Sequence, residues 1–267
     1  MNAIGISLRQ VIASLVMALA AWAAHAGRPC EAKLPDVAAV SNAFALAERT
    51  AHALDASGAR VVIIGRAGQD LRRYGLRWSH LALAYRDDST SGRPWRVVHK
   101  LNQCGSARAD LYRQGLAEFF LDDLFRYEAA YAVPDAEVQA RLIAVLVDDE
   151  RVARLHTAAY SMLAYPWSQR YQQSNQWAIE TLAMAIDDNA QSRGRAQAWL
   201  KLKGYEPTVL KIGALTRLGA RIGSANIAFD DHPDELRYSD HIETVTVDSV
   251  FAWLERAKLA DPVQVLR

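Results

Sequence analysis

The sequence predicts an α+β fold in which a small antiparallel sheet packs against helices. Apolar residues recur at helical spacing in stretches such as 37–54 and 135–147, which indicates amphipathic helices. Between such stretches lie short runs rich in β-branched or alternating residues. Two of these runs, 78–85 and 95–101, are joined by a short polar turn, which is typical of an antiparallel hairpin. Apolar residues make up 51% of the 267 positions, enough for a sizeable core.

The N-terminal half is expected to begin with a helix and to continue mainly as strands. The helix 37–54 ends at Ser57, where a glycine follows. Alternation along 78–85 places His80 on a face of small side chains, which another element can approach closely. The other elements expected here are a buried strand 61–64, a polar turn 65–70, a turn 87–94, a strand 95–101, a helix within 116–124 and a strand 127–133 ended by Pro134.

The C-terminal half is expected to be mainly helical. Asp135 is placed to cap a helix over 135–147, whose apolar face carries Val138, Leu142 and Val145. The other elements expected here are a helix 152–164, a break at 165–167, a helix from Ser174 or Asn175 to Ile186, a short helix 196–203 ended by Gly204, a helical stretch 209–221, a loop 230–233, a strand 242–247 and a helix capped by Asp248 and running to Lys258.

Charge and motifs exclude several classes of partner. The formal net charge of +1 predicts no nucleic-acid partner and no binding to an anionic membrane surface. The turn 65–70 lacks the Gly-Lys-Ser/Thr ending of a phosphate loop and the spacing of a dinucleotide site. The acids of 230–233 and His232 offer metal ligands, but adjacent residues rarely converge on one ion, so an exposed polar turn is expected there. The sequence therefore predicts no cofactor and no metal.

The N-terminus has the pattern of a cleaved export signal. Arg9 precedes an uncharged, largely apolar stretch, 11–26, and the Ala-His-Ala sequence at 24–26 resembles a signal-peptidase site. We therefore predict a signal peptide over 1–26 and a single exported α+β domain over 27–267, in the periplasm or secreted. The alternative is an uncleaved membrane anchor, but the apolar stretch is shorter than the ~20 residues that span a bilayer. No membrane span is expected after cleavage.

Export to an oxidising compartment would favour a disulfide between the two cysteines. Cys30 and Cys104 are the only cysteines of the chain, and a disulfide between them is the simplest expectation in an oxidising compartment. Closing such a long loop constrains the unfolded chain by roughly 4 kcal/mol in the entropy model. The alternative is a catalytic thiol at Cys104. This alternative is weaker, because a reactive thiolate needs a helix N-terminus or a cationic neighbour, and the turn around Cys104 shows neither.

A constellation of polar residues predicts a site. Acyl transfer needs a nucleophile, a base that takes its proton and a polar group that orients the base. A helix N-terminus adds N–H donors for the developing oxyanion. Ser174 at a helix start is the candidate nucleophile and His80 the candidate base, with His99 or Asn102 as the orienting group. The alternatives are a helix cap at Ser174 or Asn175, a buried structural histidine at His80 and a half-exposed strand histidine at His99.

Further residues are candidates for the lining of a cleft around this site. Arg66 and Asp70 lie in the polar turn after the first strand, where the alternative is a surface ion pair worth well under ~1 kcal/mol. Aromatic side chains beside a polar site can wall a groove for peptide or glycan, although most are expected in the core. The predicted cleft-lining residues are Arg66, Gln69, Asp70, Asn175 and Trp177.

These residues resemble a known group of domains. The stretch Ser79-His80-Leu-Ala-Leu-Ala is similar to the histidine strand of circularly permuted papain-like (NlpC-type) domains, in which the histidine precedes the nucleophile. In that group the later helix typically opens with Cys-x-x-aromatic, and Ser174-Asn-Gln-Trp177 is similar, with serine in the cysteine's place. The resemblance implies a permuted papain-like arrangement of the α+β fold and an envelope peptide as substrate class.

A closer resemblance covers most of 27–267. The chain resembles an exported bacterial family, domain-of-unknown-function family twenty-one forty-five. The similar stretches are Gly65-Arg-Ala-Gly-Gln-Asp-Leu71, Trp78-Ser-His80, Ala164-Tyr-Pro-Trp-Ser168 and Tyr171-Gln-Gln-Ser-Asn-Gln-Trp177.

The serine leaves more than one function open. A helix dipole and a histidine can convert a thiol to a thiolate before substrate arrives, whereas a hydroxyl needs a base aligned at the moment of attack. The first hypothesis is an envelope hydrolase or acyltransferase that acts on an amide or ester bond through Ser174. The second is a non-catalytic envelope binding or assembly protein that uses the same cleft, and the third is a structural exported protein without a cleft.

Overall fold

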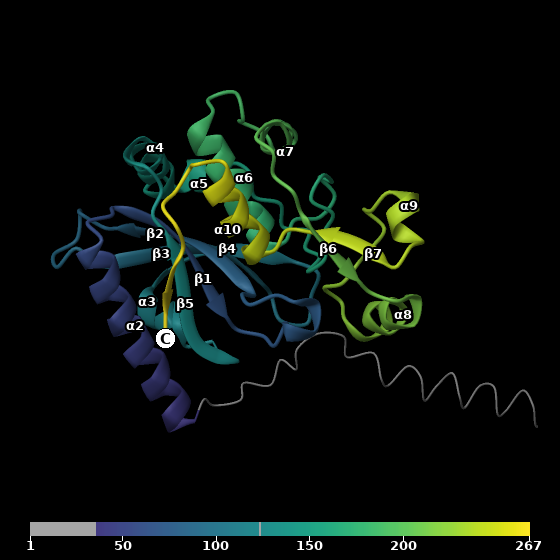
Figure 1. The fold of residues 1–267 in the computed structure, drawn as a ribbon, viewed down its shortest axis with the longest axis horizontal. Helices are drawn as coiled ribbons and strands as arrows, with labels where there is room; N and C mark the ends of the chain where they lie inside the picture. Colours follow the sequence, from purple (N-terminus) through teal and green to yellow (C-terminus); the bar gives the residue numbers. More distant parts are fainter. Residues whose placement is uncertain (1–35, 123) are drawn as a thin grey trace, which may run out of the picture.

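A six-stranded antiparallel sheet forms the centre of the computed structural model, which describes residues 36–122 and 124–267 and gives only the backbone at 221–223 (Figure 1). The strand order is β4-β3-β2-β1-β5-β8, and neighbouring strands pair in antiparallel register. This confirms the predicted α+β class and the hairpin of β2 with β3. The strands are β1 (Val61–Ala67), β2 (His80–Arg86), β3 (Trp95–Asn102), β4 (Ala109–Gly115), β5 (Arg126–Ala132) and β8 (Gln264–Leu266).

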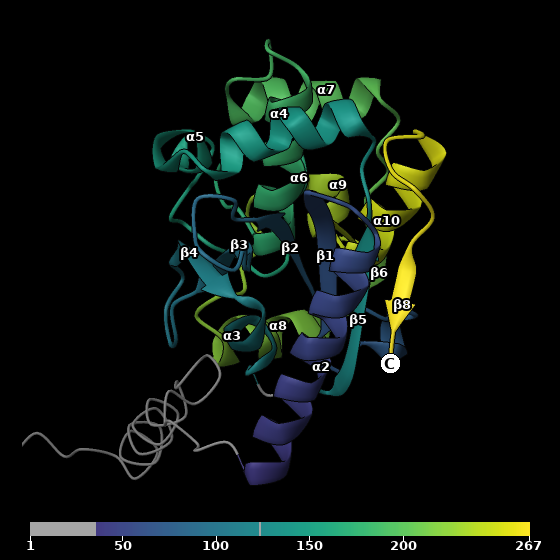
Figure 2. The same cartoon turned by 90° about the vertical axis from the view of Figure 1, so that its left-hand side faces the viewer.

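Helices cover both faces of the sheet (Figure 2). Alternation along β1 explains why two cores form: Val61 and Ile63 belong to one hydrophobic cluster, whereas Val62 and Ile64 belong to the other. The second cluster packs under α2 (Val37–Ala56) and α3 (Leu116–Phe120). The first and larger cluster packs under five other helices. These are α4 (Ala136–Leu146), α5 (Asp149–Ala153), α6 (Ser174–Ile186), α7 (Arg193–Leu202) and α10 (Val247–Arg256).

Helix α10 lies unusually close to the sheet at Gly65. A Cβ atom at this position would stand 2.8 Å from Val247 Cγ1 and 3.3 Å from a ring atom of Phe251. The missing side chain therefore allows α10 to pack on β1, and it explains why a glycine interrupts an otherwise β-branched strand.

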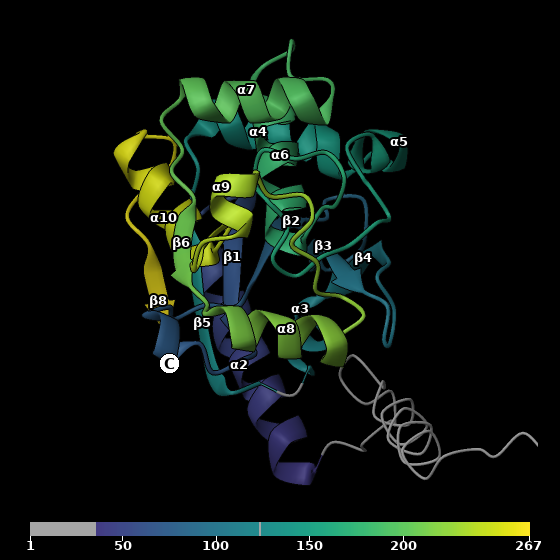
Figure 3. The ribbon, with the colours of Figure 1, turned by 90° about the vertical axis from the view of Figure 1, so that its right-hand side faces the viewer.

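A smaller unit stands beside the main sheet. It contains a two-stranded sheet of β6 (Thr208–Lys211) and β7 (His241–Thr244), together with α8 (Ala214–Gly223) and α9 (Asp234–Arg237) (Figure 3). Leu210, Ile212, Phe229 and Ile242 form a third hydrophobic cluster there. A short 3-10 turn, η1 (Arg72–Tyr74), brings Tyr74 against this cluster.

Several predicted boundaries are wrong, each for a tertiary reason. The predicted helix 152–164 ends with α5 at Ala153, because the chain beyond it is held extended: Arg108 forms a β-bridge with Ala159, and Lys100 Nζ donates to the carbonyl of Thr157 at 2.6 Å. Strand β4 was missed because an edge strand needs only one apolar face and this one carries several charged residues. Strand β6 replaces the start of the predicted helix 209–221, and α8 supplies the rest.

The cap of α10 also differs from the prediction. Thr246, rather than Asp248, caps α10, and its hydroxyl accepts from Ser249 N at 3.1 Å. The Asp248 carboxylate instead accepts from the backbone N–H groups of Arg77 and Trp78. By contrast, Asp135 caps α4 as predicted, with Oδ1 2.9 Å from Val138 N. Asp248 therefore does not cap α10, because its carboxylate accepts hydrogen bonds from another segment of the chain.

Candidate functional site

A chain of hydrogen bonds links His80, His99 and Gln114 across three neighbouring strands. His99 Nε2 lies 2.8 Å from Gln114 Oε1, and His99 Nδ1 lies 2.9 Å from His80 Nε2. Because an amide oxygen only accepts, His99 carries its proton on Nε2 and its Nδ1 accepts from His80 Nε2–H. This arrangement leaves His80 Nδ1 unprotonated, which is the state a general base requires.

The surroundings keep both imidazoles neutral. Burial lowers the pKa of His99 to about 4, with a further contribution from the positive charge of Arg66. Burial, Arg66 and His99 together lower the pKa of His80 well below its usual range. Arg66 is itself held beneath the pair, where it donates to the Phe119 carbonyl and, at 2.6 Å, to Asp122. Both imidazoles are therefore neutral near pH 7.

Ser174 is the first residue of α6. The residue before it, Gln173, has extended backbone angles and occupies the cap position without a capping side chain, so neither Ser174 nor Asn175 caps the helix as predicted. Gln173 Nε2 instead donates to Thr244 Oγ1 and to the Val245 carbonyl, both at 2.7 Å. Among the described residues no side chain caps the first N–H groups of α6, which carry the partial positive charge of a helix N-terminus.

Asn175 places this helix end against the sheet. The ladder between β2 and β3 ends at Leu83 and Val98, and beyond it the N–H of Leu81 donates to Asn175 Oδ1 at 2.8 Å. The Asn175 amide also donates to the Val245 carbonyl at 3.3 Å. A side chain of α6 thus takes the place of a strand partner, and the start of the helix is fixed beside the His80 end of β2.

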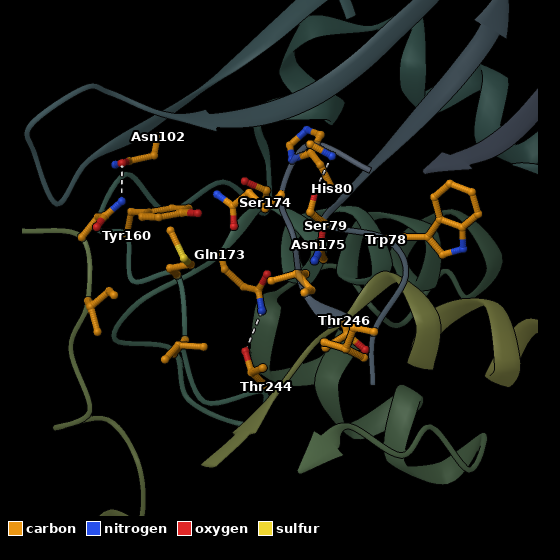
Figure 4. Close-up of a pocket in the computed structure, with 18 of the residues that line it drawn as sticks. Trp78, Ser79, His80, Asn102, Tyr160, Gln173, Ser174, Asn175, Thr244 and Thr246 are labelled. Atoms are coloured by element: carbon orange, nitrogen blue, oxygen red, sulfur yellow. Dashed lines mark hydrogen bonds between the residues drawn. The ribbon is translucent and has the colours of Figure 1, made fainter. Parts of the chain in front are cut away.

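A cavity of about 970 Å³ brings the candidate residues together (Figure 4). Ser174, His80 and His99 all line it. Across the described part of the chain, Ser174 forms no hydrogen bond with His80; Tyr160 also lines the cavity, and burial raises the pKa of its phenol while the Ser174 hydroxyl lowers it to a smaller extent. His80 Nδ1 likewise has no hydrogen-bond partner among these residues. Catalytic hydrogen bonds are often long before a substrate is bound, so this geometry is compatible with a resting nucleophile.

The predicted cleft-lining residues do not all reach the cavity. Arg66, Gln69, Asp70 and Asn175 line it. Trp177 does not: its side chain is fully buried in the larger hydrophobic cluster, since it lies one turn into α6 on the side that faces the sheet. The surface pair of Arg66 with Asp70 is also wrong, because Arg66 bonds Asp122 and Asp70 bonds Arg72.

Asn102 lines the cavity but does not orient the histidine. Its amide nitrogen donates to the carbonyls of Ser106 and Arg108, and its oxygen accepts from Asn226 at 2.9 Å. These bonds close the turn between β3 and β4. Of the two predicted orienting groups, only His99 contacts His80.

Gln114 and Tyr160 belong to the site but were not among the residues predicted from the sequence. Gln114 lies on β4 and reaches His99 through the ladder of β3 with β4, a strand pairing that the sequence did not indicate. Tyr160 lies in the segment predicted as a helix. No local pattern marks either residue; a correct assignment of β4 would have placed Gln114 beside the histidine strand.

A buried ion pair holds the segment that leads into α6. Glu180 is fully buried and accepts from Arg193 at 2.8 Å, and Gln172 and Gln197 donate to the same carboxylate. Arg193 in turn donates to three backbone carbonyls between Ser168 and Tyr171. The position of Ser174 therefore depends on a network one turn and more away from it.

The loop 230–233 is not the exposed turn that was predicted. Asp231 and His232 have fully buried side chains: His232 Nδ1 lies 3.0 Å from Asp231 Oδ1, and Asp231 Oδ2 accepts from Tyr165 N. His232 Nε2 lies 3.0 Å from the Glu243 carbonyl, so the loop makes structural contacts with two other segments. In the part of the chain that the structure covers, no group of three or more His, Cys, Asp or Glu side chains is arranged to hold a metal ion.

The disulfide prediction is directly testable. Cys104 lines the cavity, whereas Cys30 and the predicted signal peptide lie outside the described residues. We expect the intact mass of the purified protein to rise by two hydrogens on reduction, because a disulfide takes up one hydrogen at each sulfur. An unchanged mass would contradict the Cys30–Cys104 pair, and a Cys104→Ser variant that cannot change mass serves as the control.

The neutral His99 predicts acid sensitivity. Its folded pKa of about 4 lies below the ordinary histidine value of 6.5, so the unfolded state binds more protons between these pH values. The free energy of unfolding should therefore be fully supported by His99 above pH ~6.5 and fall by about 3 kcal/mol as the pH drops to ~4. Urea unfolding of His99→Gln should show a shallower fall over that range. The same substitution at exposed His52 should leave the slope unchanged, and an equal slope in both variants would contradict the assignment.

The fold and cavity define an α+β protein with a neutral histidine pair beside a serine-bearing helix N-terminus. The chain belongs to the bacterial family described as "Uncharacterized protein conserved in bacteria (DUF2145)", whose family model matches residues 53–254. The family resemblance predicted from the sequence is thereby confirmed. No match was found among curated proteins or among solved structures. Within residues 36–122 and 124–267, none of the helices has the length and apolar character to cross a membrane.

Proposed function

We propose that this protein is an exported envelope hydrolase or acyltransferase in which Ser174 is the nucleophile, His80 the base and His99 the orienting group. The observation that carries the proposal is the cavity that Ser174 and His80 share, in which His99 holds His80 with Nδ1 free to accept a proton. The permuted papain-like arrangement, with serine in place of cysteine, and the export signal are part of this proposal.

The chemistry follows from the two nitrogens of His80. His80 Nδ1 removes the proton of Ser174 Oγ as that oxygen attacks the carbonyl carbon of an ester or amide. The new carbon–oxygen bond forms a tetrahedral intermediate, which collapses as the imidazolium returns the proton to the leaving group. An acyl-serine remains, and water or another hydroxyl or amine, deprotonated by the same nitrogen, then releases the acyl group.

The start of α6 stabilises the negative charge that develops in the intermediate. The oxyanion of the intermediate develops next to Ser174, where the first backbone N–H groups of α6 carry partial positive charge. The low pKa of His99 serves the same step, since a neutral His99 accepts from His80 Nε2–H and holds the tautomer with the free Nδ1. Gln114 fixes His99 in turn.

A serine-reactive fluorophosphonate probe tests this proposal. We expect covalent labelling of the wild-type protein and none of Ser174→Ala, because the phosphorus atom bonds to the activated hydroxyl. Ser79→Ala is the matched control: Ser79 lines the same cavity, but its hydroxyl accepts from Gly68 N and donates to the Arg66 carbonyl. Labelling that persists in Ser174→Ala would assign the nucleophile to another residue.

A second candidate function is a non-catalytic envelope binding or assembly protein that uses the same cavity. The observation that favours it is that, among the described residues, the Ser174 hydroxyl makes no hydrogen bond to His80, whose Nε2 is bonded to His99. On this reading an envelope peptide or glycan occupies the cavity without being cut. The absence of labelling in the wild type, together with saturable binding of a muropeptide, would support this function over the first.

A further inference from the structure

One side of the cavity is walled almost entirely by apolar side chains, and we call it the apolar compartment. It coincides with the third hydrophobic cluster, which covers neither face of the main sheet. The cluster members that line the cavity come from four segments: η1 with the residues just after it, β6 with the residue just after it, and two loops. The residues that line both the cluster and the cavity are Tyr74, Leu76, Leu163, Leu210, Ile212, Ile227 and Phe229.

The compartment is continuous with the candidate nucleophile. Ser174 and Tyr160 line the same cavity; Tyr160 lies three residues before Leu163, and Met162 between them also lines it. Gln173, the residue before Ser174, donates a hydrogen bond to Thr244, the last residue of β7 (Figure 4). A ligand held at Ser174 can therefore extend along Met162 into the compartment.

The chemistry of this wall selects against polar ligands. None of the compartment side chains is charged, and the phenol of Tyr74 is the single polar group among them. Charged groups of the cavity such as Arg66, Asp70 and Glu118 come from β1, the turn after it and α3, and Arg73 of η1 lines the cavity with its guanidinium 4.5 Å from the centroid of the Tyr74 ring. A glycan or peptide placed in the compartment would lose hydration without gaining hydrogen bonds, whereas a hydrocarbon chain would gain by burial.

We infer that the substrate of Ser174 carries a straight aliphatic acyl chain, which lies in the apolar compartment while its carbonyl carbon meets the Ser174 hydroxyl. The inference rests on the proposed function and names the substrate class for it. The total cavity volume of about 970 Å³ lies within the range of small-molecule sites and accommodates an acyl chain with its head group. The acyl carbonyl can come from the ester of a glycerolipid or from an N-acyl peptide.

A series of p-nitrophenyl esters, from acetate to palmitate, tests the inference on the exported protein. We expect kcat/KM to rise by about fourfold for each added methylene until the compartment is full, the factor that corresponds to burying one CH₂ group. Calorimetry should show that fatty acids up to dodecanoic acid bind Ser174→Ala with an affinity that rises with chain length in the same way. Binding does not need the hydroxyl. Release of fatty acid from phosphatidylglycerol vesicles or from an N-dodecanoyl peptide then distinguishes the two sources.

Two variants alter the compartment and one serves as a control. Leu163→Gln places an amide in the wall, and Ala220→Trp fills the space from α8, where Ala220 lines the cavity. Each should lower the ratio of dodecanoate to acetate hydrolysis by about tenfold, because only the longer chain reaches the altered wall. Leu215→Gln is the matched control, because Leu215 lies on α8 with 86% of its surface exposed and does not line the cavity.

The outcomes separate the inference from the function on which it rests. Hydrolysis of all esters at equal rates, with no binding of dodecanoic acid, would contradict the inferred acyl-chain substrate. It would leave Ser174 as the nucleophile. Binding of dodecanoic acid without hydrolysis of any ester would overturn the nucleophile and support the compartment as a binding site. An equal loss of acetate and dodecanoate hydrolysis in Leu163→Gln and Ala220→Trp would mean that the wall only supports the fold, which contradicts the inference.

Discussion

Replacing Glu180 by glutamine should lower the free energy of unfolding by about 3–5 kcal/mol, the largest loss of stability expected from a single substitution in this chain. Four donors from three side chains meet the buried carboxylate: Arg193 Nε and Gln172 at Oε2, a second Arg193 nitrogen and Gln197 at Oε1. A glutamine must turn its NH₂ group toward two of these donors in either orientation. It also leaves the Arg193 charge, 7% exposed, without a counter-charge.

Urea unfolding monitored by circular dichroism measures the effect on Glu180→Gln. The matched control is Glu137→Gln, which removes an ion pair with Arg141 one helical turn away at a carboxylate that is 78% exposed. We expect less than about 0.5 kcal/mol there, because solvent screens such pairs. Similar small losses in both variants would show that the Glu180 network is not the anchor of the segment before α6.

Replacing His80 by glutamine should reduce the rate of fluorophosphonate labelling, and of ester hydrolysis, by about 10²–10⁴-fold. Glutamine can still donate its amide N–H toward His99 Nδ1, so the strand contact is kept. It offers no basic nitrogen to Ser174, and the serine hydroxyl is then not activated. Stability should change by no more than about 1.5 kcal/mol, the range of one hydrogen bond.

His156→Gln is the control for this prediction. His156 is also partly buried and its pKa is lowered by burial, but it does not line the cavity. Its replacement should leave the labelling rate within about threefold of the wild type, since general-base catalysis is lost only at the residue that takes the proton. A His80→Gln rate that matches that of His156→Gln would place the base elsewhere.

The sequence located the central elements because their patterns are local. Alternation over 78–85 and the paired run at 95–101 predicted β2 and β3, and the Asp135 cap with its apolar stripe predicted α4. Where long-range contacts override local preference, the prediction failed. The apolar residues of 152–164 indicated a helix, but the chain is helical only to Ala153, because Lys100 binds the carbonyl of Thr157 and Arg108 forms a β-bridge with Ala159.

For the site, the sequence determined which residue types are present and in what order: a histidine strand, a second histidine and a later hydroxyl at a helix start. Only the tertiary structure decided how they meet. Asn175 inserts where β2 and β3 separate, and this contact sets Ser174 and His80 on one cavity while Trp177 turns into the core. Likewise Gln114, rather than Asn102, completes the histidine chain. These outcomes depend on strand pairing and on buried hydrogen bonds between residues far apart in sequence, which no local periodicity encodes.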